Sequence, residues 1–151
     1  MNIYNPYLII PFVAWFVAHC IKFSLRALNG DVNVRYFYAS GGMPSGHSAT
    51  VLALATTALV HAGWSSPLFG VVAVIAVIVV YDSFGVRRSS GDQAVAINTI
   101  LKKLPKDQKL SDLKLREVLG HTPSEVIVGS LLGITVALLM SISTWLPKIS
   151  L

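Results

Sequence analysis

Three short polar clusters interrupt an otherwise apolar sequence, and each contains side chains that could bind or transform an anion. They occupy residues 41–48 (GGMPSGHS), 81–88 (YDSFGVRR) and 120–125 (GHTPSE). Imidazoles exchange protons near neutral pH, and arginines bind phosphate oxygens through paired hydrogen bonds. If the fold brings the clusters together, this combination of residues predicts a site for a phosphate group.

The first cluster has the features of a tight turn that leads into a helix. Glycines permit a sharp turn, and Pro44 suits the start of a helix. The backbone N–H groups of Ser45, Gly46 and His47 would then be unpaired at a helix N-terminus, where the helix dipole attracts an anion. We expect the His47 imidazole to lie beside that anion.

The third cluster has two compatible interpretations. Thr122 and Glu125 have the spacing of a capping box, with Pro123 at the first helical position. Glu125 also follows His121 by four residues, so its carboxylate could orient the imidazole and raise its basicity. The sequence leaves both interpretations open.

The cationic residues also have structural alternatives. Arg87 and Arg88 could hold a phosphate, or they could form a stop-transfer pair that binds lipid headgroups. Lys22 is followed four residues later by Arg26 on the same helical face, and a lone Lys at the end of a span is usually an interfacial anchor. His19 and His61 are most simply interfacial or packing residues, without assigned chemistry.

The composition indicates a membrane protein. The 151 residues are 54% hydrophobic and 13% charged, with a mean hydropathy of +0.65, whereas soluble domains carry about 25% charged residues. No Asp, Glu, Lys or Arg occurs in residues 1–21, 36–81 or 126–147. The expected fold is therefore all-α: a polytopic bundle in one integral membrane domain, residues 1–151. It has about four transmembrane helices, at 5–21, 46–63, 66–82 and 123–146.

These spans place the loops at 22–45 and 83–122 on one side, and they carry eleven of the twelve basic residues. The positive-inside rule then predicts that the clusters face the cytoplasm or a topologically equivalent compartment. The membrane expected to contain the protein is the plasma (inner) membrane. This rule also accounts for the net charge of +5 without a nucleic-acid partner. Residues 92–104 are expected to form an amphipathic interfacial helix, and 111–119 a second short helix.

Residues 129–133 provide a GxxxG spacing, which allows close helix packing and also permits a homo-oligomer through membrane helices. Of these two outcomes, close packing within one chain is the expected one. Residues 63–66 (GWSS) separate the second and third spans so closely that a tight helical hairpin is expected.

The three clusters, in this order, resemble the divergent branch of the type 2 phosphatidic acid phosphatase (PAP2) superfamily, which is related to vanadium haloperoxidases. The sequence Pro44-Ser45-Gly46-His47 matches the central motif of that superfamily, and the resemblance extends from about Lys22 to Gly133. It implies a phosphatase that needs no metal or other cofactor and acts through a phosphohistidine intermediate.

The resemblance implies a role for each matching residue. His121 would be the nucleophile, Glu125 the residue that orients it, and His47 the acid that protonates the leaving oxygen. Ser45 and Gly46 would cradle the phosphate. The superfamily's first motif, Lys, six residues and Arg-Pro, is missing as a whole, since residues 29 and 30 are Asn and Gly. The Ser-Arg of its third motif is replaced by Lys114 and Leu115. Lys22 and Arg87 or Arg88 are the expected substitutes by location.

A site at headgroup depth predicts a membrane lipid as the substrate, such as phosphatidic acid, phosphatidylglycerophosphate or a prenyl diphosphate. Two other functions remain open. One is a phospholipid-binding or transport protein that keeps the phosphate pocket without catalysis. The other is a metal-dependent hydrolase that uses Asp82, Asp92 and His121, although the two aspartates lack a recognisable ligand spacing.

Overall fold

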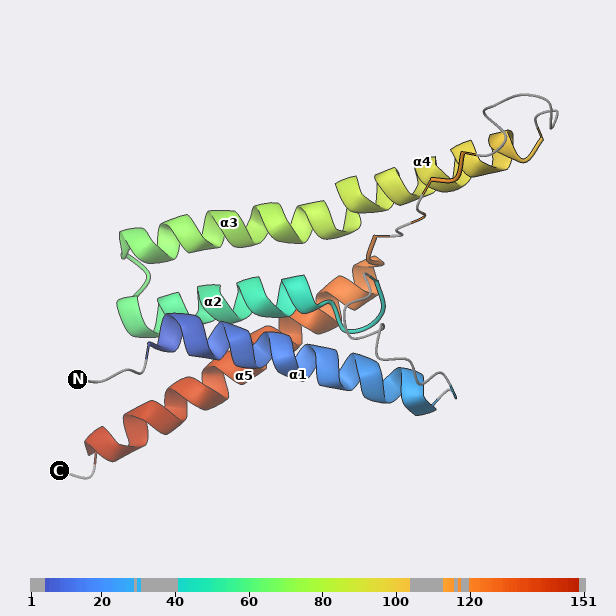
Figure 1. The fold of residues 1–151 in the computed structure, drawn as a ribbon. Coiled ribbons are helices and arrows are strands. Elements are labelled where there is room, and N and C mark those ends of the chain that lie inside the picture. Colours follow the sequence, from blue (N-terminus) through green and yellow to red (C-terminus); the bar gives the residue numbers. More distant parts are fainter. Residues whose placement is uncertain are drawn as a thin grey trace.

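The computed structural model describes residues 5–28, 30, 41–103, 113–115, 117 and 120–149. These residues form five helices and contain no strand (Figure 1). The helices are α1 (Pro6–Leu28), α2 (Gly46–Ala62), α3 (Pro67–Phe84), α4 (Val86–Leu101) and α5 (Pro123–Ile149). The prediction of an all-α fold is confirmed.

The membrane character is confirmed as well. In the described part of the chain, three helical stretches are long and apolar enough to cross a bilayer: Pro6–Leu28, Pro67–Leu101 and Pro123–Ile142. The remaining predicted span corresponds to α2, which has 17 residues and is therefore close to the lower limit of about 17 for a spanning helix. Helix α2 runs alongside α3 and contacts α1, α3 and α5 (Figure 1).

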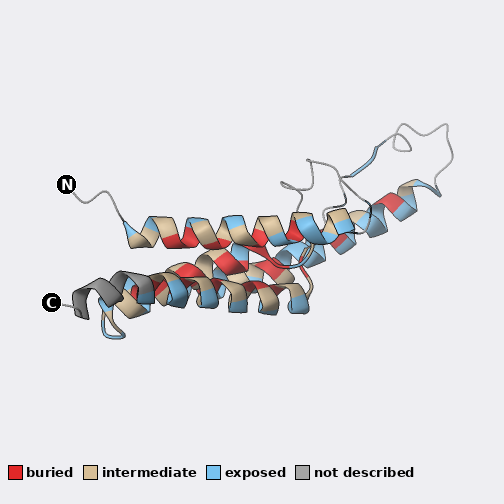
Figure 2. Ribbon diagram, turned by 90° about the horizontal axis from the view of Figure 1, so that it is seen from below, coloured by how far each residue is buried: buried red, intermediate tan, exposed pale blue. Residues whose placement is uncertain are grey.

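Small side chains allow α2 to pack closely against its neighbours. On one side, Ala53 of α2 packs with Ala14 of α1 and Ala137 of α5, and all three are fully buried. On the other side, Ala55 and Ala58 pack against α3. Figure 2 shows the buried residues along the faces that the helices turn toward one another. Since surrounding lipid is as apolar as these side chains, the bundle depends on close packing rather than on hydrophobic burial alone.

The GxxxG spacing brings α5 against the backbone of α2, as expected. A Cβ atom at Gly129 would collide with the carbonyl oxygen of Ser45, and one at Gly133 with the carbonyl oxygen of Ala49. The contact is therefore made within one chain, and it lies at the end of α2 that carries the first polar cluster.

The predicted hairpin between the second and third spans is confirmed. Gly63 ends α2 with a positive φ of 85°, a conformation that favours glycine, and its N–H donates to the Leu59 carbonyl. The Ser66 hydroxyl accepts a hydrogen bond from the Leu68 N–H and caps α3, and Pro67 is the first helical residue.

The 83–122 loop differs from the expectation. Its first helix, α4, begins at Val86 rather than near residue 92, and only Gly85 separates it from α3. Figure 1 shows α4 continuing beyond the bundle roughly along the direction of α3. The apolar periodicity at 92–104 marked only the second half of this helix, because Val86 is the only apolar side chain in its first half (VRRSSGDQ).

The second predicted interfacial helix, at 111–119, lies largely outside the described residues, and residues 113–115 and 117 are not helical. Hydrogen bonds from the buried Asn98 side chain explain the position of Leu115 and Glu117. Its amide donates to the Leu115 carbonyl and the Glu117 carboxylate, both at 2.8 Å, and its oxygen accepts from the Leu115 N–H at 2.9 Å. These bonds hold the returning chain against α4.

The α2–α5 contact predicts that Gly133→Ala destabilises the protein by about 1–3 kcal/mol, because the new methyl group has no space beside the Ala49 carbonyl. Gly70→Ala is the matched control, since a Cβ atom there meets no atom within 4 Å. Thermal unfolding in detergent, followed by the loss of the monodisperse peak in size-exclusion chromatography, measures both. Equal melting temperatures for the two variants would contradict the proposed contact.

Candidate active site

Four helix ends meet at one end of the bundle and bring the polar clusters together (Figure 1). These are the C-terminal ends of α1 and α3 and the N-terminal ends of α2 and α5. The Ser45 N–H donates to the Glu125 carbonyl at 3.0 Å, and the His121 N–H donates to the Ser83 carbonyl at 3.1 Å. Gly120 lies directly against the backbone of Arg87 and Arg88. Backbone contacts thus connect all three clusters.

The two histidines expected to act together are neighbours. The ring centroids of His47 and His121 are 6.5 Å apart, with the rings steeply inclined at 66°. His47 is exposed at the start of α2, whereas His121 is buried just before α5. The geometry confirms that the first and third clusters converge, and one phosphate group could contact both rings.

Glu125 satisfies both interpretations left open by the sequence. Its N–H donates to the Thr122 hydroxyl at 3.4 Å, and its carboxylate accepts from the Thr122 N–H at 3.2 Å, which completes the capping box. The same carboxylate oxygen lies 2.8 Å from Nδ1 of His121. When Nδ1–H donates to this carboxylate, Nε2 keeps its lone pair. The cap of α5 thereby also fixes the His121 ring.

The expectation that the Ser45 N–H is unpaired is wrong, because this group donates to the Glu125 carbonyl. The Ser45 side chain is fully buried, accepts from the Ser48 N–H at 3.4 Å and contacts the Ser48 hydroxyl at 3.0 Å. Ser45 is therefore the N-cap of α2 and a link to α5. The backbone N–H groups of Gly46 and His47 remain at the first turn of α2, where the helix dipole favours an anion.

Lys22 lies at the centre of this region. Only 4% of the residue is exposed, although Lys is seldom buried without a partner. Its ammonium group is close enough to Arg26 and Glu125 to interact electrostatically with the charges of both. It is also close enough to interact electrostatically with the imidazole of His47. Gly42, with a φ of 86°, lies against the Lys22 and Arg26 side chains. The first cluster and the C-terminal part of α1 are therefore in contact, as the location of Lys22 predicted.

The structure separates the two arginines that the sequence left equivalent. The charge of Arg87 acts on His47, and its Nε donates to the Asp82 carboxylate at 2.7 Å on an exposed surface. Arg88 instead lines a surface cavity with Asp92 and Gln93 of α4. Of the pair, Arg87 therefore has the closer electrostatic connection to His47.

His19 belongs to this region, although the sequence analysis assigned it no chemistry. A Cβ atom at Gly46 would lie 2.6 Å from Cε1 of His19, so the imidazole lies directly against the start of α2. His19 Nδ1 contacts the Trp15 carbonyl at 2.8 Å, and its ring lies 4.4 Å from that of Trp15. Its position three residues before Lys22, on the same helical face, was the signal that could have revealed it.

The described residues contain no group of three or more His, Cys, Asp or Glu side chains that could hold a metal ion. Asp82, one of the three ligands considered from the sequence, is paired with Arg87. The proposed ligand set of Asp82, Asp92 and His121 is therefore not supported.

The fold and site define an all-helical membrane protein with a histidine- and cation-containing cluster at one end of its bundle. A sequence model of the Divergent PAP2 family matches residues 3–136, and the chain belongs to that family. It is 43% identical over 114 residues to the uncharacterized membrane protein YuiD of Bacillus subtilis (strain 168), covering 68% of this chain and 72% of that protein. No solved structure matches the chain.

The His19–Gly46 contact predicts a coupled pair of substitutions. Gly46→Ala alone should lower stability by about 1–3 kcal/mol, because its methyl group would collide with the imidazole. Adding His19→Ala removes the obstructing ring, so the double variant should be more stable than the sum of the single effects predicts.

Thermal unfolding of the four proteins in this double-mutant cycle measures the coupling. A parallel cycle with His61→Ala is the control, because His61 lies fifteen residues, about 22 Å, further along α2. Additive effects in the His19 cycle would contradict the contact.

Proposed function

We propose that this protein is an integral membrane phosphatase that hydrolyses a lipid phosphate or diphosphate through a phosphohistidine intermediate. The observation that carries the proposal is the 6.5 Å separation of the His47 and His121 rings, with the Glu125 carboxylate on Nδ1 of His121. Membership of the Divergent PAP2 family supports the same reaction class.

His121 is the proposed nucleophile. With Nδ1–H donating to Glu125, the Nε2 lone pair attacks phosphorus, and the bond from phosphorus to the ester oxygen breaks. The resulting imidazolium is stabilised by the adjacent carboxylate. Glu125 also caps α5, so the orientation of the nucleophile is set by the helix itself.

His47 is the proposed acid and base. Its protonated ring donates a proton to the departing alkoxide, and the neutral ring then accepts a proton from the water that attacks the phosphohistidine. This second step releases inorganic phosphate and restores both histidines. The exposure of His47 is consistent with the access that water needs for this step.

Lys22 and Arg87 are the proposed cationic partners of the phosphate. Catalysis of phosphoryl transfer depends largely on positioning and charge stabilisation. The position of Lys22 against Gly42 of the first cluster, and of the Arg87 backbone against Gly120, supports their assignment. The N-terminal ends of α2 and α5 add positive dipole potential. These groups supply the positive charge that the absent first-motif residues would have provided.

The membrane setting favours a lipid substrate, whose phosphate reaches the site while its hydrocarbon chain stays among the helices or in the bilayer. The proposed location is the cytoplasmic face of the plasma membrane. The bias of eleven basic residues among twelve toward the loops on this side supports that orientation. Prenyl diphosphates, phosphatidic acid and phosphatidylglycerophosphate are the substrates to compare.

The first test is phosphate release from these three lipids in detergent without added metal. His121→Ala and His47→Ala should each lower kcat by at least about 10³-fold, because each removes a group that participates directly in bond breaking. His61→Ala is the control and should keep full activity, since His61 lies at the opposite end of α2.

Full activity in either histidine variant would overturn the assignment. Binding of orthovanadate or a lipid phosphate by the unmodified protein, without turnover of any of the three lipids, would instead favour the non-catalytic phospholipid-binding function. The leucine that replaces the arginine of the third motif at position 115 is the observation that makes this second function worth testing.

The different surroundings of Arg87 and Arg88 lead to a further prediction. Arg87→Gln should weaken orthovanadate binding by about 10- to 100-fold, which corresponds to the loss of one charge-assisted hydrogen bond. Arg88→Gln is the matched control and should change the dissociation constant little, because Arg88 lines a different cavity. Isothermal titration calorimetry in detergent measures both constants, and a larger effect at Arg88 would reverse the assignment.

A further inference from the structure

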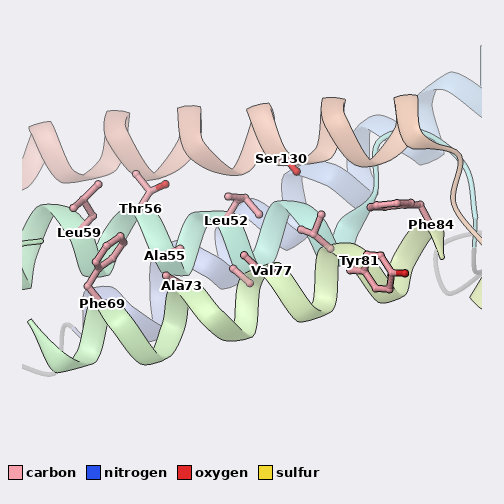
Figure 3. Close-up of a pocket in the computed structure, with 12 residues that line it drawn as sticks. Leu52, Ala55, Thr56, Leu59, Phe69, Ala73, Val77, Tyr81, Phe84 and Ser130 are labelled. Atoms are coloured by element: carbon pink, nitrogen blue, oxygen red, sulfur yellow. The ribbon is translucent and has the colours of Figure 1, made fainter. Parts of the chain in front are cut away.

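A long apolar groove of 560 Å³ lies between α2 and α3 (Figure 3). Leu59 and Phe69 line one end, Ala73 and Val77 the middle, and Tyr81 and Phe84 the other end. Ser130 of α5 also lines the groove, so a third helix contributes to it. The volume lies within the range of about 300–1,000 Å³ of small-molecule sites.

The shape of the groove suits an extended chain. Phe69 and Phe84 are fifteen residues apart on α3, so the groove extends for about 22 Å along the helix axis. This distance is most of the bilayer's hydrocarbon thickness of about 30 Å. Small residues in the middle of α3, Ala73 and Ala76, leave the space that larger side chains would fill.

The groove faces hydrocarbon rather than water. Of the residues that line it, Val77 is 69% exposed and Tyr81 is 63% exposed, although both belong to a helix that is long and apolar enough to span a bilayer. Such a surface is covered by lipid when the protein is in a membrane. A hydrocarbon chain can therefore enter the groove sideways from the bilayer.

One end of the groove reaches the candidate active site. Tyr81 and Phe84 line the groove, and between them lies Ser83, whose carbonyl accepts the His121 N–H. Asp82, also between them, pairs with Arg87. The apolar surface thus ends where the histidine and cationic residues begin.

We infer that this groove holds one hydrocarbon chain of a lipid whose phosphate lies beside His47 and His121. The inference rests on the proposed phosphate site, but it does not require turnover. Its physical basis is the continuity of an apolar groove with a cationic end, which matches a molecule that has a long chain and an anionic head.

The test uses a phosphonate analogue of phosphatidic acid, which is not hydrolysed at the position of the ester oxygen, with a diazirine in one chain. A diacylglycerol with the same diazirine chain is the probe without phosphate. The purified protein is illuminated in nanodiscs of neutral phospholipid, and mass spectrometry maps the labelled residues. The phosphonate should label groove residues of α2 and α3 about tenfold more than the diacylglycerol does, the ratio expected from one charge-assisted hydrogen bond.

Two substitutions should remove the preference by filling the groove: Ala73→Phe in its middle and Val77→Trp at its exposed rim. Val74→Phe is the matched control, because Val74 is 61% exposed on α3 and does not line the groove. The control should keep the tenfold ratio. Elution in size-exclusion chromatography verifies that each variant is folded, and Val77→Trp tests the inference even if Ala73→Phe does not fold.

Three results would overturn the inference. Equal labelling by both probes would indicate contact with bulk lipid only, and unchanged labelling in the folded filling variants would show that the labelled site is not the groove. A groove that neither probe labels would indicate that something else, such as a second copy of the chain, covers it. These results are independent of catalysis. If the phosphonate labels the groove preferentially but no lipid releases phosphate, the proposed phosphatase function is rejected and the hydrocarbon-chain site is retained. If phosphate is released without preferential labelling, the hydrocarbon-chain site is rejected and the phosphatase function is retained.

Discussion

The site depends on the close approach of the α2 and α5 backbones. Gly129 and Gly133 allow this approach because a Cβ atom at either position would collide with a carbonyl oxygen of the Ser45–Ala49 segment. The hydrogen bond from the Ser45 N–H to the Glu125 carbonyl then fixes the two helix starts at the same level. His47 is two residues after Ser45 and His121 is four before Glu125, so the spacing of the two rings follows from this helix contact.

Glu125 connects helix formation with the chemistry proposed for the site. A carboxylate in the first turn of α5 is favoured by the helix dipole and by its hydrogen bond from Thr122. Those interactions hold it where its oxygen also meets Nδ1 of His121. A neutral substitute could keep part of the cap without supplying a charge to the imidazole. Stability of α5 and orientation of His121 are therefore two consequences of one side chain.

Local patterns made much of this arrangement predictable. The capping box at Thr122 and Glu125 and the glycine pair of α5 each involve residues within one or two helical turns, and the structure contains both. The expectation that Pro44 begins the helix is wrong by two residues, because Ser45 is the N-cap and Gly46 the first helical residue of α2. Contacts between distant segments were not predictable in the same way. The Ser45 N–H bond, the packing of His19 on Gly46 and the different surroundings of Arg87 and Arg88 all depend on which helix ends meet. The start of α4 was not predictable from periodicity, because its first half has Val86 as its only apolar side chain.

The departures from the superfamily motifs are compatible with a retained phosphate site, because an anion responds to the positions of positive charges and not to their order along the chain. Lys22 comes from α1, Arg87 from the start of α4, and the two helix dipoles from α2 and α5. All four elements have an end at the same side of the bundle. A cation lost from one loop can therefore be replaced from another element that ends nearby. Such replacement is easier in a site built from helix ends than in one built along a single helix. The burial of Lys22 points the same way, because a buried ammonium group needs an anionic partner and apolar packing alone does not provide one.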